Sequence, residues 1–282
     1  MGSAPSLPGR LVLLGHPVAH SLSPTFQNAA LRRAALPLTY EALDVAPAGL
    51  SGALDELARL NAAGNVTIPH KEAVAARCGR LTPLAERVGA VNTFWHEAGR
   101  LVGDNTDVGG VDEAVRALVG DVPRGVRVAL VGAGGSAAAV MAAAEGWKGA
   151  RVAVWSRTTE RSVALAARFP GVASAVEFLA EAIRGADVAI NATPIGLAGD
   201  DIPFPPALLG RSAAVLDLVY RRDGPTPWVQ LAVAQGRRAS DGLAMLVAQG
   251  ALSFERWFGV QPDRAAMREA LRVAMQRGDG AR

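Results

Sequence analysis

Residues 126–137 read VRVALVGAGGSA, a short apolar run that passes into a glycine-rich turn and then into an alanine-rich segment. The apolar run predicts a buried strand, and the alanines predict a helix over about 136–145. The turn between them fits G-x-G-x-x-A, in which glycines allow close approach of the backbone to a pyrophosphate. An ordinary glycine-rich turn is the alternative. The strand–turn–helix context favours a dinucleotide site at the free N–H groups of the helix.

Similar strand and helix patterns lie on both sides of this stretch and predict an α/β fold. Two strand–helix series, separated near residues 109–124, indicate two α/β domains with mainly parallel sheets. The stretch 242–275 is helical, and its pattern does not decide which domain it joins. The predicted strands of the first series are 10–14, the region near Tyr40, 65–69 and 90–95, with helices over 23–35, 50–60 and 71–78. Those of the second are 126–131, 151–155, 187–193 and 213–220, with helices over 136–145 and 161–169.

The residues after the strand 151–155 indicate which dinucleotide binds. NAD sites usually place an acidic residue there for the ribose 2′-OH. This chain instead has SRTTER at 156–161. The guanidinium groups of Arg157 and Arg161, together with the Thr158 hydroxyl, suit a 2′-phosphate. For Arg161 alone, a solvated helix charge is an equal alternative. The set as a whole favours NADP over NAD.

Composition excludes several classes of protein. The 282 residues carry a net charge of +3, and the arginines are scattered without a basic run, which argues against nucleic-acid binding. A lone Cys78 allows no intrachain disulfide and suggests no metal cluster. No stretch has the length of a membrane span or a signal-peptide core. We therefore expect a soluble cytoplasmic protein without a metal, as a monomer or a homodimer.

Polar residues interrupt the apolar pattern of the first half. Ser23, before Pro24, is predicted to cap a helix. Ser21 has no such role in the pattern, and two hydroxyls at a helix N-terminus suit an anion such as a carboxylate. Asn65 and Thr67 alternate and therefore share one side of an extended segment. Turn capping is an alternative for either residue alone.

Lys71 is unusual in this composition. Of 29 Lys and Arg residues, only Lys71 and Lys148 are lysines. A lysine can lose its proton when it is buried, whereas an arginine remains protonated. Asp107, brought near Lys71 in a cleft, would complete a proton-transfer pair. A plain N-cap role for Asp107 stays open.

Eight motifs follow one another over roughly residues 15 to 250. They are HPVAHSLSP (16–24), NVTIPHK (65–71), GAVNT (89–93), NTD (105–107), GAGGS (132–136), SRTTER (156–161), NATPIGL (191–197) and DGLAMLVAQG (241–250). In this order they resemble the motifs of the shikimate dehydrogenase family; together they are specific, although none is specific alone. Members of that family reduce 3-dehydroshikimate to shikimate with NADPH, in the route to chorismate and aromatic amino acids.

The resemblance implies a fold and a set of site residues. Residues 1–109 and 243–282 would form the substrate-binding domain, with a C-terminal helix that returns to it, and 110–242 a Rossmann-like NADP domain. Lys71 would be the acid/base, paired with Asp107. Substrate ligands would be Ser21, Ser23 and Tyr220 at the carboxylate, and Asn65, Thr67, Asn92, Asp107 and Gln249 at the ring hydroxyls. Cofactor ligands would be Gly132, Ala133, Gly134, Gly135 and Ser136 at the pyrophosphate, Ser156, Arg157, Thr158 and Arg161 at the adenosine end, and Asn191, Thr193, Leu218 and Gly242 at the nicotinamide side.

Three positions depart from the usual motifs and bear on cofactor selectivity. Ser156 replaces a common Asn, alanines occupy 137–139 where Arg or Lys is frequent, and RRDGPTP (221–227) is longer or rearranged. A quinate or dual quinate/shikimate dehydrogenase, with NAD as its cofactor, is the nearest alternative. A ligand-sensing relative without catalysis is an alternative of another class, and the presence of both Lys71 and Asp107 argues against it.

Overall fold

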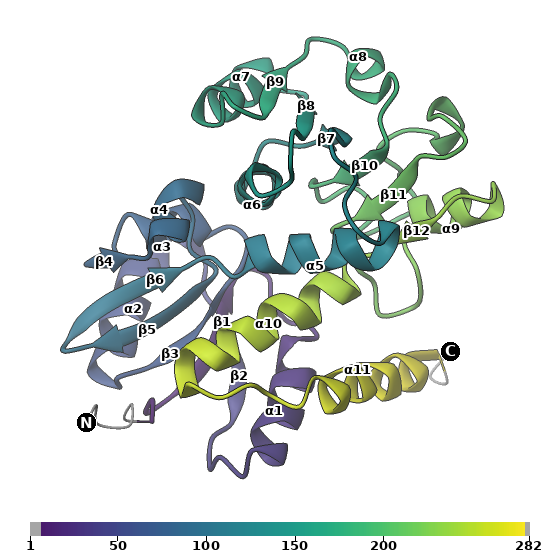
Figure 1. Cartoon of the computed structure of the whole chain (residues 1–282). Coiled ribbons are helices and arrows are strands. Elements are labelled where there is room, and N and C mark those ends of the chain that lie inside the picture. The colour runs from purple at the N-terminus through teal and green to yellow at the C-terminus, as the bar shows by residue number, and fades with distance from the viewer. Residues whose placement is uncertain (1–6, 280–282) are drawn as a thin grey trace. The chain divides into compact units, whose positions relative to one another are not determined.

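The computed structural model describes residues 7–279, which divide into two compact units, each built on a six-stranded sheet (Figure 1). The first unit contains the chain up to Thr106 and again from Val247 onward. The second unit is Asp107–Leu246. Both sheets pack against helices, so the chain is α/β in each unit. The assignment of one unit to substrate and the other to cofactor remains a prediction.

The first unit has the strand order β2-β1-β3-β5-β6-β4. Parallel pairs join β1 to β2 and β3, and β4 to β6, whereas β5 is antiparallel to both neighbours. This sheet is therefore mixed: three of its five strand pairs are parallel, in line with the expectation of a mainly parallel sheet, and β5 makes both antiparallel pairs. Its strands are β1 (Leu11–Gly15), β2 (Tyr40–Asp44), β3 (Ala63–Val66), β4 (Arg80–Leu81), β5 (Thr93–Glu97) and β6 (Arg100–Asp104).

The antiparallel part is a hairpin that the sequence pattern did not reveal. Its turn is Ala98-Gly99, with φ of 49° and 76°. A two-residue hairpin turn whose twist matches its strands needs positive φ at both central positions. Glycine adopts this conformation freely, but alanine does so rarely, and the signal was therefore weak. The strand predicted over 90–95 is observed at Thr93–Glu97, and β6 follows the turn.

Helices of the first unit cover its sheet and include the end of the chain. The predicted helix over 242–275 is two helices, α10 and α11, and Gly259 (φ 67°) follows α10 directly. Helix α11 packs along α1, where Arg33 Nε donates to Asp263 Oδ2 at 3.1 Å (Figure 1). The C-terminal segment thus belongs to this unit. Its helices are α1 (Ser23–Arg33), α2 (Leu50–Arg59), α3 (Lys71–Ala75), α4 (Pro83–Val88), α11 (Arg264–Asp279) and most of α10 (Leu243–Phe258).

The second unit has the strand order β9-β8-β7-β10-β11-β12, with every pair parallel. Its first strand lies beside its fourth, which is the order of the Rossmann fold, and ligands bind where the order reverses. The sequence predicted four strands here, and the short outer strands β9 and β12 were missed. The elements are α5 (Asp107–Val119), β7 (Arg127–Val131), α6 (Gly135–Glu145), β8 (Arg151–Trp155), α7 (Thr159–Arg168), β9 (Ala173–Ala175), α8 (Leu179–Ile183), β10 (Val188–Asn191), β11 (Ala214–Asp217), α9 (Pro227–Ala234) and β12 (Ala239–Ser240).

The core of each unit holds the strand ends in place. In the second unit, Phe204 and Trp228 pack edge to face with ring centroids 5.2 Å apart, and Trp228 Nε1 donates to Phe204 O at 2.8 Å. Such an aromatic pair adds about 1 kcal/mol to the stabilisation from burial of its surface.

Between residues 7 and 279, no helix is long and apolar enough to cross a membrane. The same described residues contain no group of three or more His, Cys, Asp or Glu arranged to hold a metal ion.

Candidate functional site

In the first unit, two predicted motifs meet at the ends of adjacent strands. β1 and β3 are parallel neighbours, so the segments that follow them emerge at the same edge of the sheet. The two segments are joined by backbone hydrogen bonds, from Thr67 N to Leu14 O (2.8 Å) and from His16 N to Ile68 O (2.9 Å). Ser21, on the first segment, and Lys71, on the second, are therefore presented by segments that share one edge.

Ser21, and not Ser23, makes the side-chain hydrogen bond at the start of α1. Ser23 is the first residue of α1, preceded by Leu22 in a helical conformation, and it provides no cap. Instead, the Ser21 hydroxyl oxygen accepts from Ser23 N at 3.1 Å. The prediction that Ser23 caps the helix is wrong, because the helical turn already includes Leu22 and the donor is satisfied from two residues upstream. Ser23 is buried and Ser21 is half-buried.

Lys71 begins helix α3 and is held from both sides. Its backbone oxygen accepts from Val91 N at 2.9 Å. His70, which is buried, places Nε2 2.6 Å from Val45 O and so packs rather than binds a ligand. Lys71 itself is half-buried. Asp107 begins α5, in the second unit, and is 4% exposed. The pairing of Lys71 with Asp107 stays a prediction.

Asn92 and Gln249 come together in the first unit. Asn92 Nδ2 donates to Thr106 Oγ1 at 2.9 Å and to Gln249 Oε1 at 3.2 Å. Asn92 Oδ1 accepts from Thr106 N at 2.7 Å. Residues from three separated motifs thus form one buried polar cluster, which brings two predicted ligands of ring hydroxyls into direct contact. Thr106 was not among the predicted substrate ligands, although it links the two motifs that contain Asn92 and Asp107.

Asn65 adjoins this cluster, and its side-chain amide is hydrogen-bonded within the protein. Asn65 Oδ1 accepts from Tyr40 Oη at 2.8 Å. Its Nδ2 donates to Asn92 O at 3.0 Å, Thr93 Oγ1 at 3.1 Å and Ser253 Oγ at 2.8 Å. An amide that is this fully bonded within the protein orients its neighbours. Tyr40, Thr93 and Ser253 were missed by sequence reasoning, because their hydroxyls look like ordinary core positions in a linear pattern.

In the second unit, the glycine-rich turn has the geometry that a pyrophosphate needs. Gly132 has φ of 114°, and a side chain there would place Cβ 2.8 Å from Ala192 O. A Cβ at Gly134 would instead have no atom within 4 Å, so the backbone at Gly134 faces open space. Helix α6 starts at Gly135, and its first N–H groups have no partner within the helix. The turn therefore fits a bound anion at this helix end.

The end of β8 exposes the predicted adenosine-side residues. Ser156 Oγ donates to Thr158 O at 2.7 Å and accepts from Thr158 N at 3.2 Å, which closes a tight turn. This turn leaves Arg157, Thr158 and Arg161 exposed near the start of α7. Ser156 therefore acts by shaping the loop. The guanidinium groups on the exposed side suit a phosphate.

The predicted nicotinamide-side residues lie at the ends of β10, β11 and β12. Asn191 Oδ1 accepts from Thr193 N (3.0 Å) and Thr193 Oγ1 (2.7 Å), which fixes the start of the loop after β10. Gly242 N donates to Val219 O at 2.9 Å, and any Cβ at Gly242 would collide with Leu218 O. Glycine is therefore required for the close approach of these two segments. Tyr220, which follows Val219, is half-buried.

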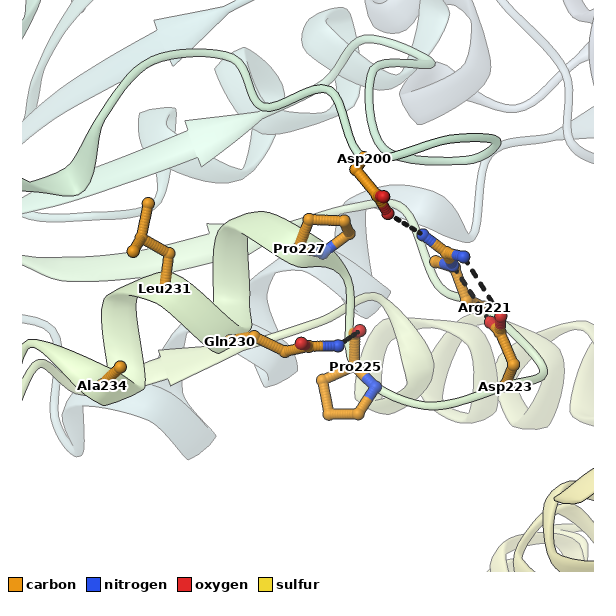
Figure 2. Close-up of a pocket in the computed structure, with 8 residues that line it drawn as sticks. All are labelled: Asp200, Arg221, Asp223, Pro225, Pro227, Gln230, Leu231 and Ala234. Carbon is orange, nitrogen blue, oxygen red and sulfur yellow. Dashed lines mark hydrogen bonds and ion pairs between the residues drawn. The ribbon is translucent and has the colours of Figure 1, made fainter.

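A separate pocket of about 620 Å³ lies on the second unit, and it contains none of the predicted site residues (Figure 2). Arg221 pairs with Asp223 through Nε–Oδ1 (3.0 Å) and Nη2–Oδ2 (3.1 Å), and Nη1 donates to Gly199 O at 2.9 Å. The RRDGPTP stretch forms a tight turn bridged from Arg221 to Gly224. Because the Arg221 charge is already neutralised, we do not take this pocket for the active site. Its lining is Asp200, Arg221, Asp223, Pro225, Pro227, Gln230, Leu231 and Ala234.

The chain matches known proteins along most of its length. The model of the shikimate dehydrogenase substrate binding domain matches residues 13–94. The models of shikimate / quinate 5-dehydrogenase and of the shikimate 5'-dehydrogenase C-terminal domain match 116–196 and 242–272. These matched segments contain Lys71, the glycine-rich turn and Gln249.

Individual relatives agree with these models. A shikimate dehydrogenase (NADP(+)) from Rubrobacter xylanophilus is 44% identical, covering 92% of this chain and 94% of the relative. One from Thermus thermophilus is 42% identical, covering 94% of this chain and 98% of the relative. A crystal structure of shikimate 5-dehydrogenase from Thermus thermophilus, in complex with NADP(H) and shikimate, has a TM-score of 0.85 at 42% identity, covering 95% of this chain and 100% of that one. This chain belongs to the shikimate dehydrogenase family.

Proposed function

We propose that this chain catalyses the reversible, NADP-dependent reduction of 3-dehydroshikimate to shikimate in the cytoplasm, on the route to chorismate and aromatic amino acids. The observation that carries the proposal is the glycine-rich turn of the second unit, at the strand-order reversal of a Rossmann sheet, in a chain 42% identical to a relative crystallised with NADP(H) and shikimate. The first unit supplies the buried amide cluster that suits a polyhydroxylated ring.

The second unit has the residues for NADP. Gly132 to Ser136 would surround the pyrophosphate, because the helix end offers free N–H groups and the backbone at Gly134 is open. Arg157 and Arg161 would clamp the 2′-phosphate, with Ser156 shaping the loop and Thr158 adding a hydroxyl. The remaining residues, at the nicotinamide side, are Asn191, Thr193, Leu218 and Gly242. Bound NADPH supplies the hydride for the reduction.

The first unit has most of the residues for the substrate. Ser21 and Ser23 lie at the start of α1 and would hold the carboxylate, with Tyr220 of the second unit beside it. Thr67, Asn92, Asp107 and Gln249 would hold the ring hydroxyls. Asn65 would act from behind these ligands by fixing Asn92 and helix α10, since its own amide is engaged.

Lys71 would protonate the carbonyl oxygen as the carbon is reduced, and take the proton back in the reverse reaction. Asp107 would orient the ammonium group. A lysine is suited to this step because it exchanges a proton, whereas an arginine at the same place supplies charge alone. Each of the two residues begins a helix, which fixes its backbone within its own unit.

The test is a matrix of initial rates, followed by absorbance of the reduced cofactor, with shikimate, quinate and aminoshikimate against NADP and NAD. We expect shikimate with NADP to be the fastest pair. Quinate-dependent formation of NADH at an equal or higher rate would favour the quinate alternative, to which one matching family model also refers. Binding of shikimate without turnover in any combination would favour a ligand-sensing protein.

A further inference from the structure

Asp217 is a fully buried carboxylate that the predicted site does not include. It ends strand β11 and is 0% exposed. Its Oδ1 accepts from Asn191 Nδ2 at 2.8 Å and from Val219 N at 3.1 Å, and its Oδ2 accepts from Thr226 Oγ1 at 2.7 Å. A buried charge is tolerated when donors surround it. Here each of the donors reaches the carboxylate from a different segment.

These segments are the loops that would line the cofactor. Asn191 starts the loop after β10, Val219 lies in the loop after β11, and Thr226 precedes α9 as its N-cap. Asn191 Nδ2 also donates to Ile195 O at 3.0 Å, so one amide joins the first residues of the loop after β10 to the carboxylate. The Asp217 side chain therefore sets where the loops after β10 and β11 lie relative to each other.

The loop after β10 in turn touches the glycine-rich turn. β10 lies between β7 and β11 in the sheet. The position of a Cβ at Gly132 is 2.8 Å from Ala192 O, so the backbone of the Asn191 loop packs directly on the predicted pyrophosphate turn. A shift of this loop would therefore change the wall of the cofactor site without altering any residue that faces the cofactor.

We propose that Asp217 is a positioning residue of the cofactor site, which fixes the nicotinamide-side loops through Asn191, Val219 and Thr226. This inference rests on the proposed function, since it assumes that the second unit binds NADPH. Asp217 touches neither substrate nor cofactor in this proposal. It acts through the residues that it holds.

The observed hydrogen bonds suit the ionised carboxylate, because Asn191, Val219 and Thr226 all donate to Asp217. Asn191 Nδ2 and Val219 N can only donate, and an amide in place of Asp217 offers them one oxygen while its NH₂ group faces the Thr226 hydroxyl, which must then turn to accept. Burial is the main cause that raises the pKa of Asp217 to about 6; the bonds from Thr226, Val219 and Asn191 oppose this rise, and the charge of Asp241 adds to it. The side chain is therefore mostly ionised at neutral pH, which matches the donors around it.

The experiment measures NADPH affinity by isothermal titration calorimetry, without turnover, in wild type and Asp217→Asn. We expect the dissociation constant to rise by about tenfold or more, the size of effect that losing hydrogen bonds to a charged group produces. The KM for shikimate at saturating NADP should stay within about twofold, because the amide cluster of the first unit is unchanged. Asp187→Asn, just before the other end of β10, is the matched control and should bind NADPH like wild type.

A second pair of variants decides the matter if Asp217→Asn does not fold. Thr226→Val removes the hydroxyl that donates to Asp217 Oδ2, and Thr226→Ser keeps it. We expect weakened NADPH binding for valine and recovery for serine. Wild-type affinity in Asp217→Asn or Thr226→Val, or an equal loss of affinity in both Thr226 variants, would overturn the inference. Wild-type protein that does not bind NADPH would instead overturn the proposed function, and this inference with it.

Discussion

Ser253 Oγ, on helix α10, lies 2.8 Å from the amide nitrogen of Asn65, which is 188 residues earlier in the chain, and accepts its hydrogen bond. The same hydroxyl donates to Gln249 O at 2.9 Å and lies 2.7 Å from Thr93 Oγ1. The end of the chain is thereby tied to β3 and β5 by buried hydrogen bonds. Because the bonded oxygen is the backbone carbonyl of Gln249, one turn earlier, the same hydroxyl fixes the part of α10 that carries a proposed substrate ligand.

Replacing Ser253 by alanine should lower both stability and substrate affinity. Removing one hydroxyl leaves buried donors without this partner, which typically costs about 1–3 kcal/mol. We expect the free energy of unfolding in urea to fall by about that amount, and the KM for shikimate to rise severalfold while the KM for NADP is unchanged. Ser51→Ala, which removes an exposed hydroxyl bonded to Arg77, should change stability by less than about 0.5 kcal/mol. An unfolding curve for Ser253→Ala identical to wild type would contradict the prediction.

The two glycines of the turn should respond differently to alanine. Gly132→Ala forces a Cβ toward Ala192 O at a positive φ, and we expect a loss of stability of about 1–3 kcal/mol. Gly134→Ala meets no protein atom and has an ordinary φ of −98°, so stability should change by less than about 0.5 kcal/mol. If the open space holds the pyrophosphate, Gly134→Ala should still raise the KM for NADP about tenfold or more, because the methyl group occupies that space.

The readouts are thermal unfolding and initial rates. A Gly134→Ala variant that folds and binds NADP like wild type would place the pyrophosphate elsewhere. A stable Gly132→Ala variant would contradict the close approach of the turn to the loop after β10.

Arg157→Ala should weaken NADP more than NAD. The loss of charge-assisted hydrogen bonds to a phosphate corresponds to about 10- to 100-fold in affinity. NAD lacks the 2′-phosphate, so its weaker affinity should change by less than about threefold. Steady-state KM values for both cofactors give the ratio. Arg184→Ala removes an exposed charge at the end of α8 and should leave both values unchanged. An equal rise in both KM values after Arg157→Ala would remove Arg157 from the 2′-phosphate site.

The sequence predicted most strands and helices of the second unit, because the backbone conformations there depend on residues that are close together in the sequence. Gly132 needs a positive φ and a close backbone neighbour, and both needs appear as a glycine at a fixed place between a strand and a helix. Strands β9 and β12 were not predicted, because segments of two or three residues are too short to show a hydrophobic periodicity.

The polar networks could not be predicted, because their partners are distant in sequence. Asp217 lay inside the strand predicted over 213–220, and only the structure brings Asn191 and Thr226 to its carboxylate. Ser253 looked like one small residue on an apolar helix face. The serine pair shows that a local rule can also fail. The rule predicted that Ser23 caps α1, but Leu22 before it is already helical, and the Ser21 hydroxyl accepts from Ser23 N instead.

Lys71→Arg should abolish most of the activity although the charge is kept. An arginine stays protonated and exchanges no proton at working pH, and positioned acid–base groups contribute about 10²- to 10⁴-fold. We expect kcat for shikimate oxidation to fall by that factor, with KM for shikimate within severalfold. The other lysine provides a matched control: Lys148→Arg, at an exposed position, should retain wild-type rates. A Lys71→Arg enzyme with near-normal kcat would show that this position supplies charge alone.

The raised pKa of Asp217 predicts a stability that depends on pH. The carboxyl has a pKa of about 6 in the folded chain and about 3.8 when exposed, because burial disfavours its charge. The folded state therefore holds this proton more tightly than the unfolded state, so the contribution to stability is full below pH 3.8 and is lost as pH rises through 6. The difference corresponds to roughly 3 kcal/mol. Asp217→Asn carries no such proton.

Urea unfolding of wild type and Asp217→Asn at several values between about pH 4 and pH 8 measures this difference. Relative to the variant, wild type should lose up to roughly 3 kcal/mol over that range, with the midpoint set by the two pKa values. A difference that does not vary with pH would show that Asp217 titrates as an exposed carboxyl does. The expected curve also has a functional meaning, because the ionised form, to which Asn191, Val219 and Thr226 all donate, is the form whose burial destabilises the fold. A carboxylate retained at that cost is better explained by positioning the cofactor loops than by stability.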